Sequence, residues 1–371
     1  MKLACKDDWD EAQERMQAWW KGEIVDRVPV QVTAPREGKK KNWPMAIAFS
    51  GQKKAPDNLE DYFTDPKQVL PRLEKAIELT YWAGEAFPVM FPVSIGMVAI
   101  LANYLGAPLR FFDVNTAWSA PIIDQWDNLP ELSFNSQNKW WKKTKRLLSK
   151  AVSRALGRYF VGIPDLNGPS EILSRLRDPN NLCLDTIENR TQIKQTINKI
   201  NYAWLRYWEA CHGVIHQHIG GYTNWMSIYS EAPFTDLQSD FSCLISPEDF
   251  NKLILPSLEQ QTEWIGRTIY HLDGPDAIRH LDSLLSLPKL SGIQWIPGAG
   301  SPPMSEWIPL LKKIQRAGKL QQIVCKKEEV RKILKELDPK GILLATACDS
   351  VKEADETIRD VEKLTHLTRW V

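Results

Sequence analysis

Two periods of apolar residues alternate along the chain. Short runs of β-branched and other apolar residues are separated by longer stretches, such as Asp249–Gly266 and Met304–Ala317, in which apolar residues recur every three or four positions. The short runs predict eight strands, at Val28–Ala34, Val89–Ile95, Tyr159–Leu166, Thr223–Tyr229, Thr268–Gly274, Ser291–Pro297, Leu320–Lys326 and Gly341–Cys348. Strands that alternate with helices are typical of parallel sheets, and eight in this order predict a (β/α)8 TIM barrel.

The remaining segments fit around one such barrel. We expect a single domain over residues 1–371, with an N-terminal helical extension (1–27), the barrel (28–348) and a C-terminal helix (349–371). Long insertions rich in Trp, Lys and Pro lie in the first half, between Ala34 and Tyr159. These insertions are expected to cover one face of the barrel.

Composition and charge remove several classes of protein. With 43% hydrophobic and 25% charged residues, the chain has the usage of a globular protein rather than a disordered or fibrous one. The 47 basic and 46 acidic residues give a net charge of +1, so no overall field attracts nucleic acid. Six Cys without a C-x-x-C motif, and no signal-peptide pattern, predict a cytoplasmic protein. The uncharged run Phe87–Leu109 is broken by Pro and Gly, so a buried strand and helix are expected there, not a membrane span.

Three residues at predicted strand ends form a candidate metal site. In TIM barrels the chemistry lies at the carboxyl ends of the strands. His271 and Asp273 alternate onto the same side of the fifth strand, and Cys348 ends the eighth. An imidazole, a carboxylate and a thiolate make a three-ligand zinc set that leaves one position for a substrate atom.

Three acidic residues near strand ends are candidate catalytic groups. Asp165 ends the third predicted strand, and Glu231 and Asp240 follow the fourth. Near a metal, such carboxyl groups serve as ligands, as general acids or bases, or as holders of a substrate ammonium. Helix capping and loop ion pairs are the alternative roles.

Aromatic residues near the same end are candidate substrate-binding groups. Trp118, Trp225, Tyr229 and Trp295 would wall a pocket for a flat macrocycle or a quaternary ammonium group. Packing in the core is the alternative for each of them.

Two further motifs favour ordinary structural roles. His212, His216 and His218 occur where a predicted helix gives way to an extended run, so they are not expected to stay together as metal ligands. Trp140–Arg158 predicts a basic amphipathic helix, whose charged face is either solvated or a dock for an acidic partner.

Five segments carry a resemblance to a known family. They read WWKGEIVDRVPVQVTAP, VGIPDLNGPSEIL, ISPEDFNKLILP, YHLDGPDAIRHLD and IQWIPGAG. Over about Trp19 to Leu344 the chain resembles the uroporphyrinogen decarboxylase superfamily, in its branch of methylcobamide:thiol methyltransferases and uncharacterised relatives. The arginine-rich loop by which the decarboxylases grip substrate carboxylates is missing from residues 32–38, which disfavours porphyrinogen decarboxylation.

The resemblance implies a methyl transfer. In that branch an H-x-C motif and a second Cys bind zinc, and His271 and Cys348 fall on this pattern while Asp273 stands where the branch has Cys. The implied function is zinc-dependent methyl transfer between a methyl-cobalt corrinoid, a methylcobamide held by a separate corrinoid protein, and a thiol or similar acceptor. The alternatives are a metal-free lyase or decarboxylase of the same superfamily, and a non-catalytic protein that binds a cobamide or another small ligand.

Overall fold

The computed structural model describes residues 3, 6–36, 58–93, 99–114, 117–216 and 220–368. Its strands are β1 Val30–Pro35, β2 Thr80–Gly84, β3 Val89–Met90, β4 Leu109–Phe111, β5 Ala117–Ser119, β6 Phe160–Val161, β7 Phe234–Gln238, β8 Arg267–Asp273, β9 Gly292–Ile296, β10 Leu320–Val324 and β11 Ile342–Ala347. Its longer helices are α1 Trp9–Trp20, α4 Pro66–Leu79, α6 Lys139–Ala155, α7 Pro169–Arg177, α8 Pro179–Glu188, α9 Arg190–Ile215, α11 Leu255–Trp264, α13 Ile308–Arg316, α14 Val330–Glu336 and α15 Val351–Thr368. The shorter ones are α3 Leu59–Thr64, α5 Ile100–Tyr104, α10 Pro247–Asp249 and α12 Leu281–Leu285.

A mostly parallel sheet is the centre of the molecule. Its strands follow the order β2-β1-β11-β10-β9-β8-β7, in which only the pairing of β1 with β2 is antiparallel. β3 and β6 pair with each other as a separate parallel ribbon. The α/β class and the parallel sheet agree with the predicted TIM-like fold, but the described residues do not show a closed barrel.

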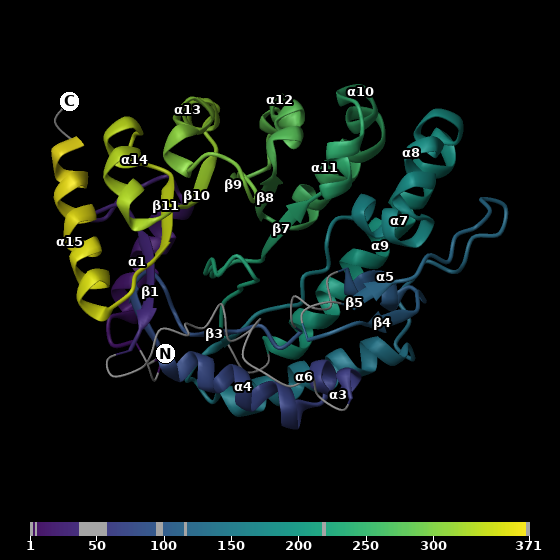
Figure 1. The fold of residues 1–371 in the computed structure, drawn as a ribbon, viewed down its shortest axis with the longest axis horizontal. Helices are drawn as coiled ribbons and strands as arrows, with labels where there is room; N and C mark the ends of the chain where they lie inside the picture. The colour runs from purple at the N-terminus through teal and green to yellow at the C-terminus, as the bar shows by residue number, and fades with distance from the viewer. Residues whose placement is uncertain are drawn as a thin grey trace.

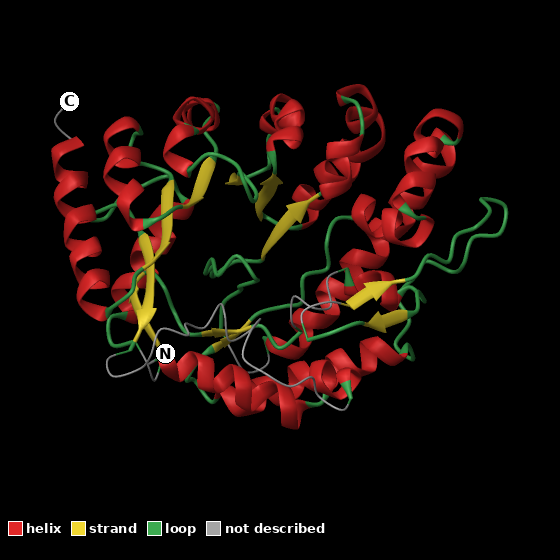
Figure 2. Ribbon diagram, viewed as in Figure 1, coloured by secondary structure: helices red, strands yellow, loops and turns green. Residues whose placement is uncertain are grey.

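Helices line the outer side of this sheet. Figure 1 shows α11 to α15 in a row outside the strands, and Figure 2 shows the strands curving around the space between this row and the helices α3, α4 and α6. On the outer face of the sheet, apolar side chains such as Ile293, Ile323 and Leu344 are fully buried. We call the opposite side of the sheet, which carries Gln31 and His271, the inner face.

One predicted strand is wrong, and its correction moves the candidate site. Thr223–Tyr229 is a loop closed by an isolated bridge between Tyr222 and Ser230, and the strand at this point of the chain is β7. The apolar residues Met226, Ile228 and Tyr229 are buried, which produced a strand-like pattern without a strand. The loop lies inside the arc of strands and leads into β7 (Figure 1).

The predicted basic amphipathic helix is α6. Asn138 caps it by accepting hydrogen bonds from the backbone N–H groups of Trp140 and Trp141. Trp141, Leu148 and Val152 are buried on one face, while Lys142 and Lys145 are exposed on the other. The recurrence of apolar residues every three or four positions therefore predicted the buried face of this helix correctly.

The apolar run Phe87–Leu109 contains β3 and α5 within the part that is described. Among the described helices none has both the length and the apolar character needed to cross a bilayer.

Candidate active site

A chain of glutamine side chains runs across the inner face. Gln31, Gln322, Gln294 and His271 lie on the four strands β1, β10, β9 and β8. The Gln322 Nε2 donates to Gln31 Oε1 at 3.0 Å, the Gln294 Nε2 donates to Gln322 Oε1 at 2.6 Å, and Gln294 Oε1 lies 2.6 Å from His271 Nδ1. We call Gln31, Gln322 and Gln294 the glutamine chain. All three are buried, and they connect strand β1 to the imidazole on β8.

A group of acids continues this polar layer beyond His271. The Trp225 ring meets the His271 ring edge-on at 4.9 Å, and its Nε1 donates to Asp236 Oδ2 at 3.0 Å. Gln238 on β7 donates from Nε2 to Asp165 at 2.6 Å and to Asp236 at 3.2 Å. Its amide therefore stands between the carboxyl groups of two partly buried aspartates and bonds to both.

Burial changes the protonation of these acids. It raises the pKa of Asp165 well above its usual range, and the nearby charge of Asp236 adds to the effect. Burial also raises the pKa of Asp236, against the opposing hydrogen bonds from Trp225 and Asn224. Asp165 is thus disposed to hold a proton that an ordinary aspartate would have lost.

Asp240 and Asp273 lie at the carboxyl end of the sheet near His271. Asp240 begins a short 3-10 helix directly after β7, and Asp273 is the last residue of β8. Much of Asp240 is exposed, but its carboxyl group is set among protein atoms, and this desolvation raises its pKa while nearby His271 lowers it. Of the residues proposed from sequence, Asp165, Trp225, Asp240, His271 and Asp273 are thus brought to one end of the sheet.

Cys348 is not brought to this group. Its Sγ lies 3.5 Å from Thr357 Oγ1 on α15, which packs on the outer face. Within the described ranges no three His, Cys, Asp or Glu side chains are arranged to hold a metal ion. The residues present therefore do not fit the expected zinc site of His271, Asp273 and Cys348.

Two more predicted residues lie at the opposite end of the sheet, in the last residues of the chain before the amino end of β7. Tyr229 is buried in an aromatic cluster with Trp9, and its hydroxyl accepts a hydrogen bond from Gln13 at 2.6 Å. Glu231 is exposed and accepts a hydrogen bond from Gln17 on α1. The structure therefore separates both side chains from His271.

The remaining two tryptophans differ in position. Trp295 is buried on the outer face, where its ring meets that of Trp307 at 5.0 Å, so it packs between the sheet and the segment before α13. Trp118 is 46% exposed on β5 and stacks under the guanidinium of Arg175, 4.0 Å from the ring centroid. Arg175 also pairs with Glu171 at 2.9 Å and acts on the pKa of Asp240, so Trp118 lies beyond the site's edge, behind Arg175.

The structure adds residues that sequence reasoning missed. These are Asp236, Gln238, Asn224 and the glutamine chain. The available signal was one or two amides set among apolar residues of the strands, as in Val30-Gln31-Val32, Ile293-Gln294-Trp295 and Leu320-Gln321-Gln322-Ile323. A buried amide needs hydrogen-bond partners, so several on adjacent strands indicate a network.

Other candidate groups lie elsewhere. His212 is buried at the end of α9 with its ring 4.2 Å from Trp208 and 5.4 Å from His216, and His218 is outside the described residues.

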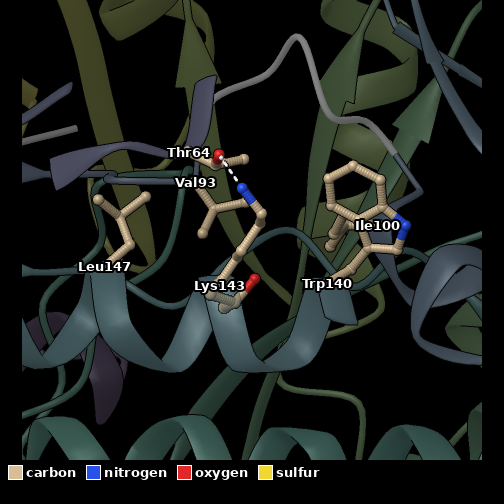
Figure 3. A pocket seen from close by; sticks show the side chains of 7 residues that line it. Thr64, Val93, Ile100, Trp140, Lys143 and Leu147 are labelled. Carbon is tan, nitrogen blue, oxygen red and sulfur yellow. Dashed lines mark hydrogen bonds between the residues drawn. The ribbon is translucent and has the colours of Figure 1, made fainter. Parts of the chain in front are cut away.

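A hollow beside α6 is lined by Thr64, Val93, Ile100, Trp140, Lys143, Thr144 and Leu147. In it Lys143 points to Thr64 and donates to its hydroxyl at 3.1 Å (Figure 3). Lys143 also pairs with Glu60, a carboxylate that it shares with Lys139.

Comparison with known proteins shows a shared fold. No family model and no curated protein matches the sequence. Among solved structures, a methyltransferase from Methanosarcina mazei is similar, with a TM-score of 0.61, 13% sequence identity, and coverage of 95% of this chain and 98% of that one. The chain therefore shares the fold of that methyltransferase over nearly its whole length.

Proposed function

We propose that this protein is a methyltransferase in which His271 removes the proton from the methyl acceptor. The observation that carries the proposal is the position of His271 at the carboxyl end of β8, where Nδ1 bonds to Gln294 and Nε2 has no hydrogen-bond partner among the described residues. An imidazole held by one nitrogen and open at the other is suited to general-base catalysis near neutral pH. The shared fold with a methyltransferase supports the reaction class.

The reaction balances without a metal at the acceptor. The proton of the acceptor passes to His271 Nε2, and the acceptor atom forms a bond to the methyl carbon. The bond between methyl and its leaving group breaks, and the leaving group keeps the electron pair. In the proposal a side-chain base takes over the activation that zinc gives in other thiol methyltransferases, because Cys348 does not reach the site.

The donor and partner in this proposal come from the sequence resemblance. The donor is a methyl-cobalt corrinoid carried by a separate protein, and the acceptor is a thiol or a similar nucleophile. The exposed basic face of α6 offers positive charge for an acidic partner.

A second candidate function is a carboxy-lyase. It is favoured by Asp165, whose raised pKa keeps a proton available in a buried setting. In that reaction the carbon–carboxylate bond breaks, the electron pair stays on carbon, and Asp165 supplies the proton that replaces carbon dioxide.

Methylcobalamin and a panel of small thiols test the first function. Loss of the cobalt–carbon bond is followed by absorbance, and the methylated thiol is identified by mass spectrometry. His271→Gln is expected to lower kcat/KM by about a hundredfold or more, whereas His216→Gln, outside the site, keeps the wild-type value. An equal rate in His271→Gln would refute the proposed base. Carbon dioxide release that depends on Asp165 would favour the lyase, and tight cobalamin binding without any turnover would favour a binding protein.

A further inference from the structure

The glutamine chain has a direction that two backbone carbonyl groups fix. The Gln31 Nε2 donates to the carbonyl oxygen of Ser227 at 2.5 Å, and the Gln322 Nε2 donates to that of Met226 at 2.9 Å. A backbone carbonyl oxygen only accepts hydrogen bonds, so each of these amides must turn its nitrogen toward the loop. A flipped Gln322 would set its oxygen against the oxygen of Met226.

This direction passes along the chain to His271. With its nitrogen turned to the loop, Gln322 presents Oε1 to Gln294, which must donate from Nε2. Gln294 is then left with Oε1 toward His271 Nδ1, at 2.6 Å. Two oxygen or nitrogen acceptors at that distance would repel each other, so Nδ1 must carry a proton.

We infer that Gln31, Gln322 and Gln294 are positioning residues that hold neutral His271 in the tautomer with the proton on Nδ1, so that Nε2 is its basic nitrogen. The tautomer follows from the hydrogen bonds alone, while its use as a base rests on the proposed function. The glutamine chain thereby does for His271 what a buried carboxylate does in a Ser-His-Asp triad, but without adding a charge.

The loop between Tyr222 and Ser230 serves both halves of the site. It supplies the two carbonyl groups, those of Met226 and Ser227. Ser227 also adopts a left-handed backbone conformation, with φ of 57°. A non-glycine residue holds this conformation at a cost that surrounding contacts must offset. One such contact is Asn224, whose Nδ2 donates to Asp236 at 2.6 Å while its Oδ1 accepts from the N–H of Met226. The same loop therefore orients the base and one of the acids.

Nitrogen NMR on the full-length protein tests the tautomer directly. The protein is labelled with 15N-histidine, and the His271 signals are assigned by their absence in His271→Gln. For the neutral imidazole we expect a protonated, pyrrole-type Nδ1 and an unprotonated, pyridine-type Nε2. The reversed pattern in the wild-type protein would overturn the inference whether or not the protein transfers methyl groups.

Three substitutions separate positioning from packing. Gln294→Leu removes the acceptor and is expected to give a mixture of tautomers with kcat/KM lowered at least about tenfold. Gln294→Glu restores an acceptor for Nδ1–H, so the 15N signals of the Nδ1–H tautomer should return. Gln321→Leu is the matched control, because Gln321 is equally buried on β10 but on the outer face, and its Oε1 has no partner within the described residues.

The outcomes distinguish the inference from the proposed function. A wild-type Nδ1–H tautomer that persists unchanged in Gln294→Leu would show that the glutamine chain does not set it. Loss of the tautomer in Gln321→Leu as well would assign the effect to general packing. An Nδ1–H tautomer that depends on Gln294, in a protein without methyl transfer to any thiol, would keep the inference and reject the methyltransferase.

Discussion

Removal of the charge of Glu85 is expected to destabilise the fold strongly. Glu85 lies between β2 and β3 with a fully buried side chain. Its carboxylate accepts hydrogen bonds from Arg27 at 2.8 and 2.9 Å and from the backbone N–H of Val30 at 2.5 Å, and Arg15 lies 3.4 Å away. Arg27 is itself 5% exposed, so Glu85→Gln leaves a buried guanidinium without its counter-charge.

The magnitude follows from this burial. Breaking a buried, hydrogen-bonded ion pair by removing one partner costs about 3–5 kcal/mol. Glu85→Gln keeps the shape of the side chain and one acceptor oxygen, so the loss measures the charge rather than a cavity. The free energy of unfolding, obtained from urea denaturation followed by far-UV circular dichroism, is expected to fall by that amount with an unchanged dependence on urea.

A surface pair gives the matched control. Glu60 contacts Lys139 and Lys143, each at 2.9 Å, with 32% of its side chain exposed. Exposed pairs contribute about 0–1 kcal/mol, so Glu60→Gln should change stability by less than about 1 kcal/mol. Equal effects of Glu85→Gln and Glu60→Gln would refute the argument that burial, rather than distance, decides the strength of these pairs.

Three other substitutions test the site. Burial raises the pKa of folded Asp165, so its contribution to stability is complete below the unfolded pKa of about 3.9 and is lost as pH rises through the folded pKa. In urea denaturation, Asp165→Asn should therefore gain stability relative to the wild type as pH rises. A difference that stays constant with pH would contradict the shift. Cys348→Ser should leave the zinc content of the protein unchanged in elemental analysis, because Cys348 faces α15, and loss of one equivalent would place the thiol in a metal site. Gly168→Ala would set its Cβ 1.8 Å from the carbonyl oxygen of Gln238, so the free energy of unfolding is expected to fall by about 1–3 kcal/mol. An unchanged midpoint of thermal or urea unfolding would show that the backbone at Gln238 moves away without cost.

The sequence allowed the second half of the fold to be predicted well. The predicted strands at Thr268–Gly274, Ser291–Pro297, Leu320–Lys326 and Gly341–Cys348 correspond to β8, β9, β10 and β11. These strands are short, rich in β-branched residues, and separated by clear helical periods. Here local propensity and tertiary environment favour the same structure.

The prediction failed at β7 because the sheet is polar on its inner face. In Phe234-Thr235-Asp236-Leu237-Gln238 the acid and the amide point inward to the site while Phe234 and Leu237 are buried. The preceding loop buries Met226 and Ile228 and thus has the more strand-like composition. Hydrophobicity alone cannot distinguish a buried loop from a strand that carries functional polar residues.

Strand alternation explains why Cys348 was misplaced. Leu343 is the parallel neighbour of Gln322, and Ala345 is that of Gln31, so both occupy the inner face. The period of two then puts Ala347 on the inner face and turns Cys348 to the outer one. Lying at the end of a strand therefore does not by itself bring a side chain to the site. Whether the residue stands at an odd or an even place along the strand decides which face its side chain is on.

The same alternation accounts for the chemistry that the site can offer. With a thiol excluded from the inner face and carboxyl groups of raised pKa beside His271, the residues that gather there are groups that carry protons rather than a set of soft metal ligands. The glutamine chain is neutral, so it orients the imidazole without stabilising its charged form, while Asp165 and Asp236 are pushed toward their neutral forms by burial. An aspartate whose pKa is raised by burial can hold a proton beside an imidazole that accepts one. The groups that gather on the inner face are therefore suited to proton transfer, and under the proposed function His271 is the residue that takes the proton from the methyl acceptor.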